Sequence, residues 1–178
     1  MERHFTVTGF LIDNDRAALH WHRKLQIWLP PGGHIDSDED MAQAVLREVR
    51  EETGIAAEIV PHVALPPFTN VRQLPPPMAI IVATVPDGPH EHIDMSYALR
   101  PVAGAERVPP EEHHDFIWVS EAELRSGDPL PVASCGVDMP IAEDVRVMAL
   151  RAIALVRARS VKGSTEDTEE HRNSEPRT

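Results

Sequence analysis

The chain opens with two apolar runs separated by a polar triplet, and this pattern predicts a β-hairpin. Residues 5–12 and 17–22 are rich in β-branched and aromatic side chains, and Asp13-Asn14-Asp15 lies between them. Short acidic and amide side chains bond their own backbone in turns, so the triplet suits a reversal of the chain. We therefore expect two neighbouring strands, followed by a polar loop over residues 23–26.

A helical periodicity comes next, over residues 40–53. At about 100° per residue, one face of this segment collects the aliphatic side chains Ala42, Val45, Leu46 and Val49. A second face, roughly 120° away, collects Glu48, Glu51 and Glu52. Gly54 follows at the position where a left-handed cap ends many helices. We expect the first face to pack on the core and the second to carry chemistry.

Further segments have the patterns of strands: residues 56–63, 78–85, 90–99 and 116–119. Residues 78–85 form a continuous apolar run, which is typical of a strand buried on both faces. Residues 90–99 alternate in polarity after a turn, so we expect them to pair with that strand. A short helical turn is expected over residues 121–125.

A second helix is predicted over residues 140–159. Acidic side chains stand near its start and basic ones near its end, as the helix dipole favours. Its packing stripe consists of Val145, Met148, Ala149, Ala152 and Val156. We expect this helix to cover the sheet. Residues 164–178 are polar and acidic, so we expect a disordered tail after a single domain over residues 1–163.

Charge and composition limit the cellular compartments and the classes of binding partner that we expect. The 178 residues carry a net charge of −12, which predicts repulsion from nucleic-acid backbones and hence no nucleic-acid polymer as a partner. The single cysteine, Cys135, suits a reducing compartment. The longest apolar stretch, residues 78–83, is too short to cross a bilayer, and the first residues lack the apolar segment of a signal peptide. We expect a cytoplasmic protein without membrane contact.

One motif carries most of the functional information. Residues 33–55 fit the pattern G-x5-E-x7-R-E-U-x-E-E-x-G-U, where U is aliphatic, at every specified position. Seven positions demand one residue type, so a chance match is expected about once in 10⁸ starting points. The segment is similar to the Nudix box, the signature of hydrolases that cleave nucleoside diphosphates linked to another group.

The resemblance agrees with the fold that the element order predicts. Strands in two groups around a central helix, with a second helix late in the chain, indicate an α/β sandwich with a mixed sheet. The Nudix fold that the resemblance implies is an α/β/α sandwich of this kind. A homodimer is common in the family, and the residues leave the oligomeric state open.

The carboxylates of the box call for a cation. Glu48, Glu51 and Glu52 stand at i, i+3 and i+4, so their charges crowd onto one patch of the helix. Mg²⁺ prefers such oxygen ligands and keeps waters that a phosphate can displace. The resemblance implies that these three glutamates, with the backbone carbonyl of Gly33, bind Mg²⁺ or Mn²⁺, and that more than one ion is held.

The resemblance also implies supporting residues and a general base. Arg47 lies one turn before Glu51 and can hold it in a coordinating rotamer. Glu39 is expected to brace the glycine loop or Arg47 rather than to bind metal. The base that activates water is either Glu52 or Glu112, which lies six residues before Trp118. Glu111 competes with Glu112, and both are also compatible with a solvated loop.

Histidines are concentrated near the box and on one predicted strand. His90, His92 and Asp94 alternate and so share one side of their strand, and His34 follows the glycine pair. Three interpretations stay open for this group. They are contact with the phosphates or nucleoside of a substrate, an accessory metal site, and a hydrogen-bonded structural cluster.

Taken together, these features predict a metal-dependent pyrophosphohydrolase in which water attacks a phosphoanhydride of a small nucleotide-derived substrate. The substrate stays open among modified nucleoside triphosphates, nucleotide sugars and other nucleoside diphosphate derivatives. Val71 occupies the place where ADP-ribose hydrolases of the family carry a proline. The alternatives are a non-catalytic Nudix-fold sensor of nucleotide derivatives, an isomerase and an RNA-cap hydrolase.

Overall fold

The computed structural model describes residues 2–84, 88–110 and 116–172, with side chains described through Ser160. Its elements, in chain order, are β1 (Glu2–Asp13), β2 (Arg16–His22), β3 (Ile27–Leu29), β4 (Gly32–His34), α1 (Met41–Thr53), β5 (Ala57–Ile59), β6 (Ala79–Thr84), β7 (His90–Pro101), β8 (Phe116–Ser120), α2 (Glu121–Ser126), β9 (Leu130–Val132), β10 (Val137–Met139) and α3 (Glu143–Arg172). In the described residues, no helix is both long enough and apolar enough to cross a membrane.

A mixed sheet forms the centre of the fold. In the described part of the chain it has eight strands, with the path β3-β2-β1-β7-β5, and β4, β6 and β8 pair with β1, β7 and β2 respectively. β1 and β7 are parallel, and the other pairs are antiparallel. The predicted hairpin is confirmed, with Asn14 and Asp15 at positive φ in its turn. β9 and β10 form a separate hairpin that the sequence did not predict.

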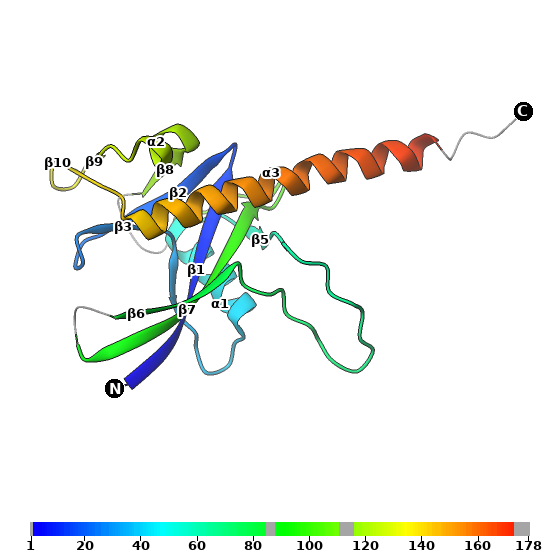
Figure 1. The fold of residues 1–178 in the computed structure, drawn as a ribbon, viewed down its shortest axis with the longest axis horizontal. Coiled ribbons are helices and arrows are strands. Elements are labelled where there is room, and N and C mark those ends of the chain that lie inside the picture. The colour runs from blue at the N-terminus through cyan, green and yellow to red at the C-terminus, as the bar shows by residue number, and fades with distance from the viewer. Residues whose placement is uncertain (1, 85–87, 111–115, 173–178) are drawn as a thin grey trace, which may run out of the picture.

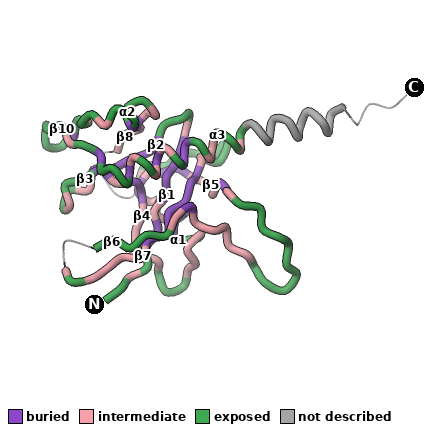
Figure 2. Tube along the Cα trace, viewed as in Figure 1, coloured by how far each residue is buried: buried purple, intermediate pink, exposed green. Residues whose placement is uncertain are grey.

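Helices cover both faces of this sheet, which confirms the α/β/α sandwich (Figure 1). Alternation along β1 divides the core between them. Val7 and Leu11 pack with α1, whereas Phe10 and Ile12 pack in the cluster that includes α3. Figure 2 shows that the buried stretches of β1 and β7 lie between the two helices.

The helix of the box forms as predicted at its ends. Asp40 caps it, accepting bonds from the backbone N–H groups of Ala42 and Gln43, and Gly54 ends it at φ 69°. The predicted packing face is confirmed for Val45 and Val49, which are buried, and for Leu46, which packs against their cluster; Ala44 and Glu52 are buried as well. Ala42, by contrast, is only partly buried and does not belong to that cluster.

The physical reason is the close approach of α1 to β1. A Cβ at Gly9 would lie 2.5 Å from Cγ2 of Val49 and 3.1 Å from Cγ2 of Val45. Because Gly9 carries no side chain, Val45 and Val49 of α1 can pack directly against the backbone of β1 at this residue. The face centred on Val45 and Val49 therefore turns inward.

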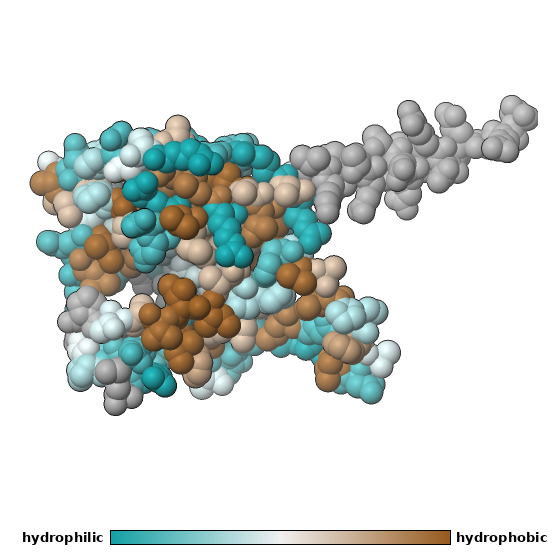
Figure 3. All heavy atoms as spheres, in the orientation of Figure 1, coloured by the Kyte–Doolittle hydropathy of each residue, from teal (hydrophilic) through white to brown (hydrophobic). Residues whose placement is uncertain are grey.

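The prediction for residues 78–85 was also wrong in its burial. The strand β6 pairs with β7, as expected, but Ile80 and Val82 are 64% and 62% exposed. β6 lies beyond β7, away from the layers that α1 and α3 cover. Figure 3 shows apolar surface gathered where β6 lies in Figure 1.

Two further elements differ from their predicted bounds. β5 is shorter than the strand expected over residues 56–63. α3 begins at Glu143 and continues to Arg172, beyond the predicted end at residue 159 and into the segment expected to be a disordered tail. Residues 173–178 lie outside the described part. The predicted stripe of α3 does pack on the sheet, with Val145, Ala149 and Ala152 buried.

Candidate active site

The glycine pair before α1 brings the chain close to the helix. In β4, Gly33 lies opposite Val7 of β1, whose side chain belongs to the core on the α1 side. A Cβ at Gly33 would overlap the carboxylate of Glu48 and would lie 2.7 Å from its Cδ. Only glycine therefore lets this carboxylate lie against the loop backbone.

Arg47 lies at the centre of the carboxylate cluster. Its Nε and Nη2 donate to the two oxygens of Glu39, at 3.1 and 2.6 Å. Its Nη1 donates to Glu48 at 2.9 Å and to Glu51 at 3.0 Å. The planar guanidinium thus fixes three carboxylates at once. The predicted contact between Arg47 and Glu51 is confirmed.

The loop before α1 is tied to the same network. Nη2 of Arg47 also donates to the backbone carbonyl of His34 at 3.1 Å, and Glu39 accepts the N–H of Asp36 at 3.0 Å. Glu39 therefore contacts both the loop and Arg47, the two supporting positions that the sequence predicted for it.

Glu52 occupies a different environment, on the buried side of the helix. It is 8% exposed, and its Oε2 accepts the backbone N–H of Gly32 at 3.2 Å. Nδ1 of His20 lies 3.6 Å from the same oxygen, and His20 is itself buried. Sequence reasoning missed His20. The alternation of β2 could have indicated it: Ala18 packs in the core on the α1 side, and His20, two residues later, faces the same side.

The charges of this cluster are unequal. Glu39, Glu48 and Glu51 all pair with Arg47, so three negative charges face one positive charge. Burial raises the pKa of Glu48, while its bond to Arg47 opposes the rise. The bond from Arg47 lowers the pKa of Glu39, and the bond to Glu39 raises the pKa of Arg47. Surplus carboxylate charge and an all-oxygen donor set fit a hard divalent cation.

The predicted histidines come together, and a fourth joins them. Ring centroids of His34 and His92 are 4.9 Å apart, and those of His90 and His92 are 5.2 Å apart. His4, which sequence reasoning did not select, lies 5.0 Å from His90 and 5.3 Å from His34 by the same measure. Burial lowers the pKa of His92, and the neighbouring imidazoles lower it further.

Asp94 does not join the histidine rings. It is 7% exposed and accepts bonds from the hydroxyls of Thr6, Thr8 and Ser96, at 3.1, 2.8 and 2.9 Å. These bonds satisfy a buried carboxylate within the sheet. The remaining predicted positions, Glu111 and Glu112 with His113 and His114, lie outside the described residues.

Comparison with known proteins assigns the family. A family model described as NUDIX domain matches residues 2–134. The chain belongs to the Nudix hydrolase family. Its Nudix helix is α1, and its Nudix glutamates are Glu48, Glu51 and Glu52.

Two relatives are named for the hydrolysis of a nucleoside triphosphate and of mRNA. The chain is 32% identical over 103 residues to the nucleoside triphosphatase NudI of Klebsiella pneumoniae, covering 57% of this chain and 67% of that protein. It is 31% identical over 107 residues to the m7GpppN-mRNA hydrolase NUDT17 of Danio rerio, covering 55% of this chain but only 33% of the relative.

The fold has a close counterpart among solved structures. A crystal structure of a NUDIX-family hydrolase from Clostridium perfringens is 28% identical, with a TM-score of 0.68. The match covers 88% of this chain and 99% of that one.

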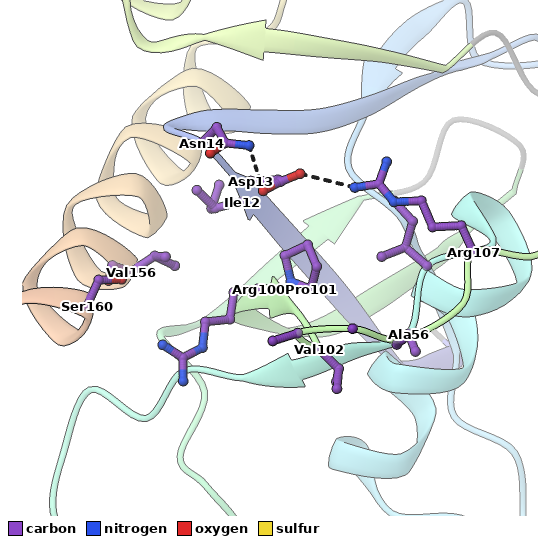
Figure 4. Close-up of a pocket in the computed structure, with 14 residues that line it drawn as sticks. Ile12, Asp13, Asn14, Ala56, Arg100, Pro101, Val102, Arg107, Val156 and Ser160 are labelled. Carbon is purple, nitrogen blue, oxygen red and sulfur yellow. Dashed lines mark hydrogen bonds and ion pairs between the residues drawn. The ribbon is translucent and has the colours of Figure 1, made fainter. Parts of the chain in front are cut away.

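A pocket elsewhere in this Nudix domain does not contain the Nudix glutamates. It lies where β1 and β7 end, beside α3 (Figure 4). Arg107 points to Asp13 in its wall, with 3.2 Å between Nη2 and Oδ2. Arg100 is bonded to Glu58 at 2.6 Å. Because carboxylates already neutralise both guanidiniums, we assign no part in the reaction to this pocket.

Proposed function

We propose that the chain is a divalent-metal-dependent pyrophosphohydrolase. It cleaves a phosphoanhydride bond in a nucleoside diphosphate linked to another group, or in a nucleoside triphosphate, by in-line attack of water. The observation that carries this proposal is the set of carboxylates around the glycine pair and Arg47. Glu48 lies against Gly33, Glu52 accepts the N–H of Gly32, and Glu48 and Glu51 share one nitrogen of Arg47, so negative charge exceeds positive charge. Such a cluster is costly unless cations balance it.

The residues fit Mg²⁺ or Mn²⁺, and more than one ion. Glu48, Glu51 and Glu52 would hold them together with the backbone carbonyl of Gly33. When bound, such ions neutralise the pyrophosphate, lower the pKa of a water and stabilise charge on the leaving oxygen.

The other side chains position these ligands. Arg47 holds Glu48 and Glu51 through one nitrogen, and Glu39 fixes the guanidinium from the opposite side. This arrangement sets the two carboxylates before substrate arrives, which lowers the cost of organising the site. We assign Arg47 and Glu39 a positioning role.

Glu52 is our choice for the general base. Its Oε2 is held by the N–H of Gly32 and faces His20, which restrains the carboxylate in one orientation. A restrained carboxylate can accept the proton of the attacking water. Glu112 is the competing base. The products would be a nucleoside monophosphate and a phosphorylated fragment, or pyrophosphate when the substrate is a triphosphate.

A small nucleotide is the expected substrate, and the cytoplasm the expected location. The net charge of −12 disfavours long nucleic acids. The exposed single Cys135 suits a reducing compartment. We also infer a homodimer, because Ile80 and Val82 at the β6 edge are exposed in the single chain.

A panel of substrates tests the proposed function. It should contain nucleoside triphosphates, nucleotide sugars, dinucleoside polyphosphates and capped RNA, since one relative is named for an mRNA substrate. Metal-dependent turnover of at least one small nucleotide is expected. Glu106→Gln, a change at an exposed loop position, serves as the matched control for Gln variants of the Nudix glutamates. Binding without turnover across the panel would instead indicate a sensor.

A further inference from the structure

Four imidazoles meet on the sheet face opposite α1, and three neighbouring strands supply them. His4 of β1 lies beside His92 of β7 in the parallel register, and His90 lies two residues before His92. His34 of β4 is paired with Thr6, on the other side of β1. All four side chains therefore emerge from one rigid surface rather than from loops.

The separations suit a metal ion. His4, His90 and His92 each place one ligand nitrogen within 4.8 Å of those of the other two. Nε2 of His34 lies 3.3 Å from Nδ1 of His4. In a tetrahedral zinc site with Zn–N bonds of about 2.0–2.1 Å, ligand nitrogens are about 3.3–3.4 Å apart. No pair among His4, His90 and His92 needs to close by more than about 1.5 Å, which rotations about the histidine side-chain bonds can supply.

An unsatisfied nitrogen points the same way. Nε2 of His92 is buried and has no hydrogen-bond partner among the described residues. A buried polar atom without a partner costs stability, so a ligand at this position would remove a cost already present in the sheet. The imidazole of His4 has an outer partner, since its Nε2 lies 3.3 Å from Glu2 Oε1. Such an outer carboxylate orients a metal-binding histidine.

The histidine cluster offers nitrogen ligands, whereas the Nudix glutamates offer oxygen ligands. Gly33 and His34 are successive residues of β4, so they face opposite sides of the sheet. The α1 side presents carboxylates, which favour Mg²⁺ or Mn²⁺, whereas the other side presents nitrogens, which favour Zn²⁺, Ni²⁺ or Cu²⁺. Two sites with different metal preferences would thus lie on either side of one strand.

We propose that His4, His90 and His92, with His34 as the fourth ligand, bind one structural Zn²⁺. The ion ties β4, which carries Gly33, to β1 and β7. It takes no part in the hydrolysis. The site would persist in a protein whose Nudix glutamates are disabled.

The test uses the full chain, produced without a polyhistidine tag and freed of metal with a chelator. Zn²⁺ alone is titrated by calorimetry into a Glu51→Gln, Glu52→Gln double variant, so that binding at the Nudix glutamates is suppressed. One Zn²⁺ per chain is expected. X-ray absorption of the zinc-loaded protein should show nitrogen ligands at about 2.0–2.1 Å with the signature of several imidazoles.

Single substitutions locate the ion. In the same background, His92→Asn and His4→Gln should each weaken zinc binding by about 10²-fold or more. His62→Asn, in a loop outside the cluster, should leave it unchanged. Zinc binding that survives both cluster substitutions, or zinc that is lost when only the glutamates are changed, would overturn the proposal. If a histidine variant does not fold, the X-ray absorption spectrum of the protein with all its histidines still tests the proposal, because a spectrum without imidazole ligands would overturn it.

Discussion

A side-chain carbon at Gly33 would lie 2.7 Å from Cδ of Glu48, well inside van der Waals contact. This pair fixes how the first glycine of the Nudix box meets its first helical glutamate. The carboxylate fills the space that a Cβ would take. Any side chain at position 33 must therefore displace either the Glu48 carboxylate or the backbone of β4.

Gly33→Ala should consequently impair the enzyme through geometry rather than through stability. The added methyl displaces Glu48 or the loop, and a shift of about 1 Å at such a site can cost about 10²-fold in kcat/KM. Steady-state kinetics at varied Mg²⁺ would measure the loss, together with a thermal melt. Gly136→Ala is the control for a loss of stability alone: its φ of 67° strains an alanine, but its Cβ would meet nothing within 4 Å, so the Tm can fall without a change in kinetics. Equal kinetics for Gly33→Ala and the wild type would refute the pairing.

Arg47→Lys should lower kcat although it keeps the charge. Lysine cannot reproduce the fork that bonds Glu39 on one side and Glu48 and Glu51 on the other. We expect a loss of about 10- to 100-fold, as for residues that orient metal ligands. The matched control is Arg125→Lys, whose exposed pair with Glu121 lies on α2. A kcat close to that of the wild type would show that Glu48 and Glu51 do not depend on the guanidinium.

His20→Ala should act on the rate more than on substrate binding. His20 is buried 3.6 Å from Oε2 of Glu52, on the side away from solvent. Without it the carboxylate can rotate, so kcat should fall by about tenfold while KM stays near its wild-type value. His62→Ala, a change in an outlying loop, tests for a general effect of histidine removal. A rise in KM alone would place His20 in substrate binding instead.

The stability of the metal-free protein should depend on pH through Glu39. Its bond with Arg47 lowers its pKa from the ordinary 4.5, so the folded state binds fewer protons than the unfolded state. The stabilisation is therefore present above the unfolded pKa and is lost as the pH falls through the lower folded value.

Thermal melts across acidic pH would measure this dependence. The Tm difference between the wild type and Glu39→Gln should be largest above the unfolded pKa and should shrink as the solution is acidified. Glu106→Gln should show no such trend. A difference that is constant with pH would mean that the Glu39 carboxylate is not selectively stabilised in the folded state.

Local chemistry explains what the sequence could predict. The end of α1 at Gly54 and the arrangement of Arg47 with Glu51 depend on residues within a few turns of each other. Their spacing along the chain largely determines their geometry. The same holds for the hairpin at Asn14 and Asp15.

Pairings between distant strands explain what it could not predict. His4 is beside His92 only because β1 and β7 are parallel neighbours, and His20 reaches Glu52 only through the packing of β2 under α1. The exposure of β6 was missed for a related reason. A continuous apolar run has the same pattern in a covered central strand and at an open edge, and only the neighbouring layers distinguish them.

The most direct test of the central claim compares the wild type with Glu52→Gln on the best substrate of the panel, in Mg²⁺ and after chelation. The account predicts turnover that requires the metal and that falls by orders of magnitude in the variant, with a Tm in the metal-free state that is no lower than that of the wild type. Turnover that persists in the chelator, or that is equal in the two proteins, would contradict it.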